Sequence, residues 1–433
     1  MAPLRSEVVA LIGGGAAGVL TASHLLRAAP GPMRVVIIER RAELGAGIAY
    51  STTDLRHLLN VRAGCLSALP DEPDHFTAWM RQHMVADGQS FLPRAWYGRY
   101  LRSLLGPVEH VRARAVQVSP RAAGVLITLS NGTRLNVDRV VLASGSSPTT
   151  WPEGLGGDVR RWIEDPWVPG ILAGLRPDEP VLLVGTGLTA VDVSLSLQAA
   201  GHSQIFATSR HGLLPSAHPE TSSVPALLDP PSRPTARSLL AWARTTADEV
   251  GDWRPVVDAL RPRTDELWAG LAIAERTRLL RHAQRRWEVL RHRMPPSVAE
   301  RIESMRDTGQ LTIVPGGVRS AHSVSRGVDV TLADRRLRVG AVVNCSGSSA
   351  DVRRSRDPLV QRLLHTRVAR PGPLCLGFDT DDRGCLPDSN DALWVVGPLR
   401  RGRLWESTAI PDIRRQATDL SRSMWRADVL VGA

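Results

Sequence analysis

The chain contains no lysine, so all 54 of its basic residues are arginine. A formal net charge of +11 would ordinarily suggest a nucleic-acid partner. The arginines, however, are scattered along the chain and form neither a basic tail nor a basic stripe. This distribution disfavours nucleic-acid binding, because a phosphate backbone attracts positive charge that is gathered on one surface.

Cysteine is also scarce. The four cysteines, Cys65, Cys345, Cys375 and Cys385, have spacings that form neither a CxxC redox pair nor a zinc pattern. The sequence therefore disfavours disulfide-reductase chemistry and predicts no metal site. Cys345 ends the apolar run 342–345, which predicts a buried structural thiol.

Long apolar runs are missing as well, since no stretch approaches the roughly 20 residues that a membrane span requires. The hydrophobic fraction of 43% and the charged fraction of 22% are typical of a globular protein in solution. A chain of 433 residues suits two large domains, or one domain that carries an insertion. The first predicted strand begins near Glu7 and leaves no room for a signal peptide, so we expect a cytoplasmic protein without a membrane partner.

Glycine, in contrast, marks two similar segments of the chain. The first, Gly13 to Gly18, follows the apolar run 8–12 and precedes a predicted helix over 19–26. In this GxGxxG pattern Gly13 allows a tight turn, Gly15 lets the backbone approach a pyrophosphate, and Gly18 lets the helix pack on the strand. Free N–H groups at the start of the helix attract an anion. We predict that an FAD pyrophosphate binds at this turn, which includes Ala16 and Ala17.

The strand that follows this helix, predicted over 34–38, ends in Glu39 and Arg40. A carboxylate at this position accepts hydrogen bonds from an adenosine ribose and repels a 2′-phosphate, so FAD fits this half better than NADP. Both residues are predicted cofactor contacts. A glycine-containing turn over 44–50 comes next, and we predict that Gly47 and Tyr50 lie beside the flavin.

The second glycine segment begins at Gly185, after the apolar run 180–184, and has Ala190 in place of the last glycine. The strand predicted over 204–208 ends without an acidic residue. An arginine at this point holds a 2′-phosphate by paired, charge-assisted hydrogen bonds, so we predict NADPH rather than NADH. The predicted contacts are Gly185, Gly187, Leu188, Thr189, Ser209 and Arg210.

Two strands that end in small residues, 138–148 and 342–347, predict the crossings between two domains. We expect an α/β fold with two Rossmann-type dinucleotide-binding domains, in which the NADPH domain is inserted into the FAD domain. The predicted FAD domain spans 1–150 and 350–433, and the NAD(P)H domain spans 151–349. Within the latter we predict a helical insertion at about 215–310, with helices over 236–250, 254–260 and 263–287.

Several further segments resemble a known family. Residues 45–51, 57–61, 91–94, 97–100 and 397–408 are similar to those of two-dinucleotide flavoproteins, the superfamily of flavin-containing monooxygenases, N-hydroxylases and related reductases. They fit a bacterial subgroup of FAD/NAD(P)-binding proteins, some of which are similar to aspartate N-hydroxylases of natural-product pathways. Residues 138–145 resemble the DxxxLATG segment of N-hydroxylating monooxygenases in part. The resemblance implies cofactor contacts at Gly145, Gly397 and Thr408.

The sequence departs from the family pattern at Pro398, where many flavoproteins carry an aspartate on the ribityl chain of the flavin. We therefore expect the flavin contacts here to come from the backbone and from a helix that starts near Trp405. The spacing of a Baeyer–Villiger fingerprint is absent, which disfavours lactone or ester formation.

The resemblance implies an FAD- and NADPH-dependent monooxygenase that hydroxylates an amine nitrogen, or a sulfur, through a flavin hydroperoxide. Its partners would be molecular oxygen and a small, possibly acidic substrate. Asn60 is the candidate catalytic residue and a candidate cofactor contact, near the reactive edge of the flavin. The candidate substrate contacts, which offer guanidinium groups to an acid, are Arg94, Arg99, Arg291 and Arg293.

Two alternatives remain open at this point. A reductase would use the same two sites to pass hydride from NADPH through FAD to an acceptor without inserting oxygen. A non-enzymatic flavin-binding regulator would bind FAD without being reduced by NADPH. The sequence also leaves the oligomeric state open, a homo-oligomer included.

Overall fold

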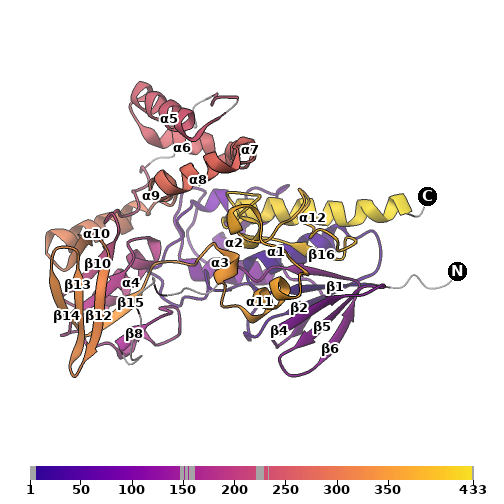
Figure 1. Cartoon of the computed structure of the whole chain (residues 1–433), viewed down its shortest axis with the longest axis horizontal. Helices are drawn as coiled ribbons and strands as arrows, with labels where there is room; N and C mark the ends of the chain where they lie inside the picture. Colours follow the sequence, from indigo (N-terminus) through magenta and orange to yellow (C-terminus); the bar gives the residue numbers. More distant parts are fainter. Residues whose placement is uncertain are drawn as a thin grey trace.

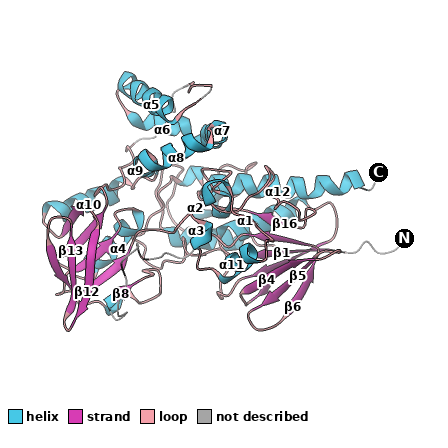
Figure 2. Cartoon of the chain, viewed as in Figure 1, coloured by secondary structure: helices cyan, strands magenta, loops and turns pink. Residues whose placement is uncertain are grey.

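The structure, a computed structural model, describes residues 6–146, 151, 155, 161–220, 229–232 and 234–431, with the backbone alone for 426–431. Its framework is a pair of five-stranded parallel sheets (Figures 1 and 2). The strands of the first sheet, in spatial order, are β16 (Leu393–Val395), β7 (Arg139–Leu142), β1 (Glu7–Ile12), β2 (Met33–Ile38) and β3 (Val108–Val111). Those of the second are β11 (Leu311–Pro315), β10 (Ile205–Ser209), β9 (Val181–Val184), β15 (Ala341–Asn344) and β8 (Trp162–Ile163).

The two sheets are built by the same order of elements. Apart from the short β8, which comes first in the second sheet, each begins with a strand, a glycine turn and a helix, which is α1 (Ala16–Ala28) in the first sheet and α4 (Leu188–Ala199) in the second. Each later leaves the parallel sheet for a three-stranded antiparallel sheet and returns through one further parallel strand, β7 or β15. The antiparallel strands are β4 (Ala115–Pro120), β5 (Val125–Leu129) and β6 (Arg134–Val137), then β12 (Val318–Val324), β13 (Gly327–Leu332) and β14 (Arg336–Val339). The predicted fold class is confirmed, since both units have the Rossmann-type arrangement.

The apolar runs of the central strands are continuous because both faces of each sheet are covered. Along β1 successive side chains point to opposite faces. Val9 and Leu11 accordingly belong to one core cluster, whereas Ala10 and Ile12 belong to another. The chain thus needs unbroken apolar strands, which explains why their sequence shows no alternation.

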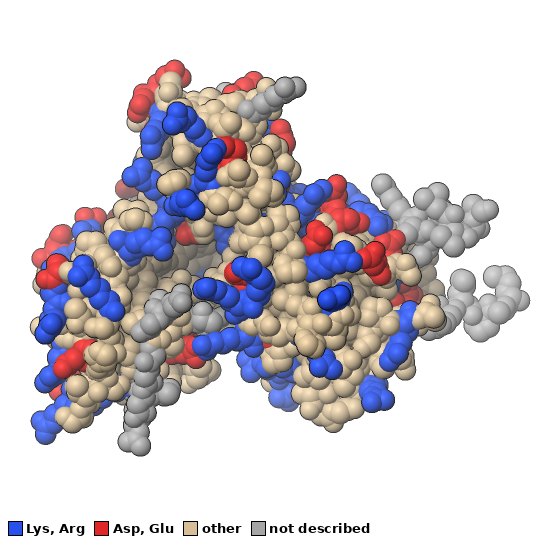
Figure 3. Space-filling view, in the orientation of Figure 1, with Lys and Arg blue, Asp and Glu red and all other residues tan. Residues whose placement is uncertain are grey.

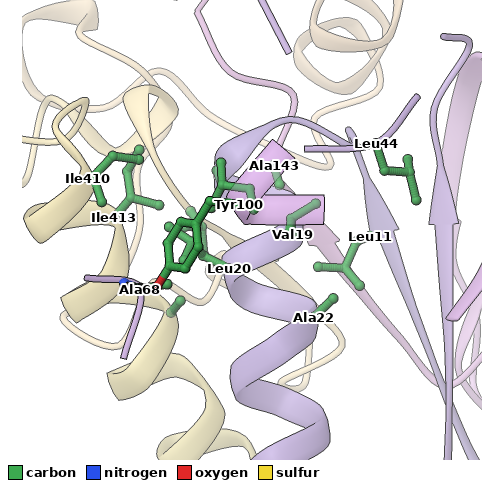
Figure 4. Close-up of a cluster of buried hydrophobic side chains, with 14 of the residues drawn as sticks. Leu11, Val19, Leu20, Ala22, Leu44, Ala68, Tyr100, Ala143, Ile410 and Ile413 are labelled. Carbon is green, nitrogen blue, oxygen red and sulfur yellow. Dashed lines mark hydrogen bonds between the residues drawn. The ribbon is translucent and has the colours of Figure 1, made fainter. Parts of the chain in front are cut away.

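Helices complete the first unit. They are α1, α2 (His75–Arg81), α3 (Arg94–Ser103), α11 (Pro358–His365) and α12 (Ile410–Val431). Figure 4 shows the core between α1 and the start of α12, where Tyr100 lies beside Leu20, Ile410 and Ile413. The buried Tyr100 hydroxyl accepts a hydrogen bond from the Ala68 backbone N–H at 3.1 Å. Strand β16 and helix α12, from the end of the chain, contribute to the same core cluster as β1 and α1.

Five short helices form a separate layer that follows β10 in the chain and appears at the top of Figure 1. They are α5 (Ala236–Val250), α6 (Trp253–Leu260), α7 (Thr264–Gly270), α8 (Ile273–His282) and α9 (Gln284–Arg291); α10 (Pro296–Asp307) then leads back to the second sheet at β11. The prediction of one helix over 263–287 is wrong, because the chain breaks into three. Gly270 ends α7, as its low helix propensity favours, and the backbone of Ala283 departs from helical geometry (φ −120°, ψ −22°) between α8 and α9.

The prediction that a helix starts near Trp405 is also wrong, since α12 begins at Ile410. Pro411 accounts for the difference, because proline has no N–H and is tolerated only in the first turn of a helix. Residues 397–409 therefore form a loop of irregular backbone and one short 3₁₀ turn between β16 and α12.

Two predicted features lie at the limits of the described structure. The boundary at residue 150, with Ser147 and Pro148 before it, falls outside the described residues, as do residues 221–228 and 233 near the start of the predicted helical insertion. Among the helices that the structure describes, none combines the length and the hydropathy required to cross a membrane. Figure 3 shows arginine side chains spread over the face in view and interspersed with acidic ones.

The tightest backbone contact of the first unit generates a prediction. A Cβ atom on Gly18 would lie 1.9 Å from the Gly13 carbonyl oxygen, so Gly18→Ala must displace the turn. We expect a loss of roughly 1–3 kcal/mol of stability from this overpacking, measured by thermal or denaturant unfolding. Gly31→Ala is the matched control, because Gly31 has no atom within 4 Å of its Cβ position. Equal unfolding midpoints for the two variants would contradict the expectation.

Candidate functional site

The first glycine turn is shaped by backbone contacts that exclude side chains. Gly13 has φ +110°, and a Cβ atom there would lie 2.4 Å from the carbonyl oxygen of Ala143. Gly15 lies against Gly47, with 3.4 Å between its Cβ position and the Gly47 Cα atom. Helix α1 begins at the next residue, Ala16, and has no acidic residue in its first turn. The turn therefore presents backbone N–H groups and a positive helix end, as an anion site requires.

Glu39 lies at the edge of this turn. Its carboxylate accepts hydrogen bonds from the backbone N–H groups of Gly14 at 3.1 Å and Arg41 at 2.9 Å. The side chain is held where β2 ends, beside the start of α1, which is where a ribose hydroxyl is bound in folds of this kind. Arg40, the next residue, is exposed.

The loop that follows β2 is fixed against the glycine turn, since the Gly45 N–H donates to the Gly14 carbonyl at 2.8 Å. Tyr50, at its end, packs on Tyr97 with 4.9 Å between ring centroids, and burial raises the pKa of its phenol. Further along, the backbone carbonyl of Asn60 accepts a hydrogen bond from His218 Nε2 at 3.0 Å. Gly145, which follows β7 at the same edge of the sheet, has φ +76°.

The second glycine turn repeats the geometry of the first. Gly185 has φ +127°, and a Cβ atom there would lie 2.2 Å from the carbonyl oxygen of Cys345. Between Gly185 and Gly187, the Thr186 hydroxyl lies 2.8 Å from the hydroxyl of Ser209, which ends β10. This bond joins the glycine turn to the strand end at which the coenzyme ribose was predicted to bind.

Arg285, on α9, lies at this turn and is not among the predicted site residues. Its Nη2 atom donates to Thr186 Oγ1 at 3.1 Å and to the Leu213 carbonyl at 2.7 Å. Its Nη1 atom lies 4.0 Å from the Cβ position of Gly187. The dense group of arginines over 285–293 indicates a candidate anion site in the sequence, but only the folding of the helical layer over the turn brings the Arg285 guanidinium to these glycines.

A cavity of about 760 Å³ opens over the second turn. It is lined by the turn itself, the ends of β10 and β15, helix α9, the segment 316–318 and the loop before α12. All six predicted contacts of the second site belong to this lining, and Thr408 does too. The loop before α12 contributes Arg401, Trp405 and Glu406 as well. Cys345 also lines this cavity; it is buried, as predicted, and burial raises the pKa of its thiol, so it stays protonated.

The loop before α12 also reaches the first glycine turn. Gly397 has φ +86°, and its Cβ position lies 3.6 Å from the Ala17 side chain, at the start of α1. Its backbone N–H donates to Gln416 Oε1 at 2.9 Å. Within the described part of the chain, Ser407 Oγ and Gln416 Nε2 are buried without hydrogen-bond partners. Unpaired buried donors beside a glycine turn fit a bound polar group such as FAD, whose oxygens would accept their hydrogen bonds.

The four arginines predicted to hold a substrate have different partners. Arg94 pairs with Asp192 at 2.8 Å and lies over the Trp167 ring, while Arg99 is exposed and lies over Trp96. Arg291 and Arg293 are both buried; the former faces Glu406 at 3.6 Å and the latter bonds Asp258 at 3.0 Å. Three of the four thus have carboxylate partners within the chain.

Arg94 and His57 belong to a polar cluster, here called the linking cluster, that joins the first unit to helix α4. It consists of Asp54, His57, Arg94, Asp192 and Ser196. Ser196 Oγ donates to Asp54 at 2.8 Å, and His57 Nε2 lies 2.9 Å from the same hydroxyl. His57 Nδ1 lies 2.7 Å from Thr52 Oγ1. Burial, reinforced by the Arg94 charge, lowers the pKa of His57 to about 4, so the ring is neutral at neutral pH.

Among the residues that the structure describes, no group of three or more His, Cys, Asp or Glu side chains is arranged to hold a metal ion.

Comparison with known proteins agrees with this geometry. A sequence model of an FAD-NAD(P)-binding family matches residues 10–147. No curated protein sequence matches the chain.

Solved structures share the fold over nearly the whole chain. The ornithine hydroxylase PvdA from Pseudomonas aeruginosa aligns with a TM-score of 0.66 at 15% identity, covering 98% of this chain and 99% of its own. DfoA, a cadaverine monooxygenase from Erwinia amylovora solved with FAD, has a TM-score of 0.67 at 12% identity, with 97% and 94% covered. The bacillithiol disulfide reductase Bdr from Staphylococcus aureus has a TM-score of 0.59 at 13% identity, with 98% of each chain covered. At such identities the likeness establishes the fold alone.

The linking cluster predicts a dependence of stability on pH. Because the pKa of His57 is about 4 in the folded chain and near 6.5 when unfolded, the unfolded chain binds the proton first as the pH falls. The contribution of His57 is complete above pH 6.5 and is lost as the pH falls toward 4. Asp192, whose pKa burial raises to about 6, acts in the opposite sense.

His57→Gln isolates this contribution. We expect the variant to lose less stability than the native chain between pH 7 and 4, with a difference of up to roughly 3 kcal/mol in the free energy of unfolding. Urea unfolding across this pH range measures it. His282→Gln, at an exposed position on α8, is the control. If His57→Gln and the native chain have the same pH dependence, the ring is not held neutral by this cluster.

Proposed function

We propose that the protein is an FAD- and NADPH-dependent monooxygenase that adds oxygen to an amine nitrogen, or to a sulfur, of a small substrate. The observation that carries the proposal is the loop over 397–408. Its first residue, Gly397, lies against α1 at the first glycine turn, and Trp405, Glu406 and Thr408 line the cavity over the second. One loop of the first unit therefore spans both sites, as direct transfer between two bound cofactors requires.

For FAD, we assign the pyrophosphate to Gly13, Gly15 and the N-terminus of α1, with Ala16, Ala17 and Gly18 completing the turn. Glu39 is assigned to the adenosine ribose, with Arg40 beside it. The flavin end is assigned to the region of Gly47, Tyr50, Asn60, Gly145 and Gly397. Ser407 and Gln416 offer buried donors there, whose hydrogen bonds the oxygens of the flavin chain would accept.

For NADPH, we assign the pyrophosphate to Gly185, Gly187, Leu188 and Thr189, with Arg285 as a charged partner. Ser209 is assigned to the ribose and Arg210 to the 2′-phosphate. Arg210 lines the cavity and directly follows β10, where an acidic residue would repel that phosphate.

A bound flavin, reduced by NADPH, supplies the chemistry that activates molecular oxygen. The chain's own task is to orient both cofactors and to keep water from the site. Trp287 and Trp405 are suited to the second task, because both line the cavity with large apolar rings. For Arg94 and Arg293 we propose positioning roles in place of substrate contacts, since both are engaged by carboxylates.

The structural likeness also includes a disulfide reductase, and the cysteines of this chain argue against that chemistry. Cys345 lies at the cavity, but its buried thiol stays protonated and is therefore a poor nucleophile. Hydride transfer between the two proposed cofactors would then proceed without a thiolate from Cys345, which supports oxygen over a disulfide as the acceptor.

The proposal is tested with the full-length protein loaded with FAD. We expect NADPH to be oxidised in preference to NADH, and a suitable amine or amino acid to lower the hydrogen peroxide released per NADPH consumed. Oxygen uptake and peroxide assays measure this coupling across a panel of amines. Oxygen-independent transfer to quinones would establish a reductase instead. FAD binding without NADPH oxidation would leave only a flavin-binding regulator.

The two arginines at the second site generate a sharper prediction. Arg210→Ala removes a charged hydrogen bond to the 2′-phosphate, worth roughly 1.5–3 kcal/mol, so the KM for NADPH should rise by about ten-fold or more. The KM for NADH should stay unchanged. Arg285→Ala should raise both KM values alike, because both coenzymes carry the pyrophosphate.

Steady-state kinetics with both coenzymes provide the measurement. Arg326→Ala, at an exposed position in the β12–β13 hairpin, is the control for the loss of a positive charge. Should Arg210→Ala weaken NADH and NADPH equally, the assignment of Arg210 to the 2′-phosphate would fail.

A further inference from the structure

The helical layer lines a second cavity, here called the helical cavity, of about 320 Å³. Helices α5 to α9 and Trp405 form its walls. Four of the twelve tryptophans of the chain line it, namely Trp253, Trp268, Trp287 and Trp405. Most of the other lining residues are leucine, valine and alanine. A cavity of about half this size takes up benzene, so this one has room for an aromatic ring with a short chain.

The helical cavity is tied to the loop that spans the two nucleotide sites. Trp268 donates through its indole N–H to the Gly402 carbonyl at 3.1 Å and packs on Trp405 with 4.7 Å between centroids. Trp287 donates to Glu406 at 3.1 Å. The helical layer is therefore anchored to the loop by two indole hydrogen bonds.

Trp287 and Trp405 line both the helical cavity and the larger cavity over the second glycine turn. These two rings are the shared wall between an apolar compartment and the coenzyme compartment. A ligand in the helical cavity would thus lie next to the compartment assigned to the coenzyme.

The charges around the helical cavity indicate the sign of charge that its ligand carries. Among the described residues, its lining includes two arginines, Arg244 and Arg286, and no carboxylate. Both arginines are exposed, which places them toward solvent. A cationic diamine has no acidic partner in such a lining, whereas an apolar molecule that ends in a carboxylate matches both the rings and the guanidinium groups.

We propose that the helical cavity binds the substrate's apolar body and that Arg244 and Arg286 hold its carboxylate. The substrate class is then a hydrophobic carboxylic acid that bears the nitrogen or sulfur to be oxidised, with that end toward Trp287 and Trp405. This assignment rests on the proposed function for the reaction, whereas the binding site itself depends only on the cavity.

Three probes that share one body test the proposal by binding alone. 3-Phenylpropanoate, 3-phenylpropanol and 3-phenylpropylamine carry a negative, a neutral and a positive end. They are titrated into the full-length protein, without NADPH, and binding is followed by tryptophan fluorescence and calorimetry. We expect the acid to bind most tightly and the amine most weakly.

Variants on α5 locate the site. Ala243 lines the helical cavity, so Ala243→Trp should abolish binding of all three probes, and Ala247→Phe, one turn later, is a second blocking variant. Ala241→Trp, on the same helix but exposed and outside the lining, should leave binding intact. Thermal unfolding verifies that each variant is folded.

Charge variants test the arginines. Arg244→Gln and Arg286→Gln should each weaken the acid by about ten-fold and leave the alcohol unchanged. Arg237→Gln, exposed on α5 and outside the lining, should change neither.

Three results would overturn the inference. The first is tighter binding of the amine than of the acid, and the second is probe binding that survives both blocking variants. The third is a dimer, detected by sedimentation, that either blocking variant dissociates, because the cavity would then be an interface between two copies of the chain. Probe binding without NADPH oxidation would contradict the proposed function and leave the ligand class in place. Coupled oxidation of an amine without binding of the acid would contradict the proposed ligand class and leave the proposed function in place.

Discussion

The structure depends on one close approach, made twice, between a glycine and a carbonyl oxygen of a neighbouring segment. At Gly13 the oxygen belongs to Ala143, and at Gly185 it belongs to Cys345. In both places the carbonyl follows the strand that returns to the sheet from the three-stranded antiparallel insert. Since a Cβ atom would fill this space, the two glycines allow each returning strand to pack against the first strand of its sheet. The nucleotide turns exist only where this contact is made.

The proposed function depends on the segments that lie around these two turns. The loop over 397–408 reaches both, and the helical layer is held to that loop by the hydrogen bonds of Trp268 and Trp287. The linking cluster of His57, Arg94 and their partners joins the first unit to α4, directly behind the second turn. The two cavities therefore share Trp287 and Trp405, whereas the linking cluster is a separate contact between the first unit and α4.

The arginines illustrate how burial decides the role of a charged side chain. A chain without lysine must use arginine for every cationic task, structural ones included. Arg293 and Arg94 are paired with carboxylates of the chain, since a charge withdrawn from water without a partner is costly. Arg210 and Arg244 occupy cavity walls instead, and these are the positions at which a guanidinium is available to a ligand.

The sequence by itself determined the two parallel-sheet units and their glycine turns, because strand, turn and helix are adjacent in the chain and each glycine has a local steric reason. It also indicated the end of β10 as the coenzyme ribose site. Only the tertiary structure decided which arginines face a cavity, placed Arg285 over a turn about 100 residues away in the chain, and closed the helical cavity against Trp405. These contacts join segments that are distant in sequence, so their geometry is set by packing between elements and not by any local pattern.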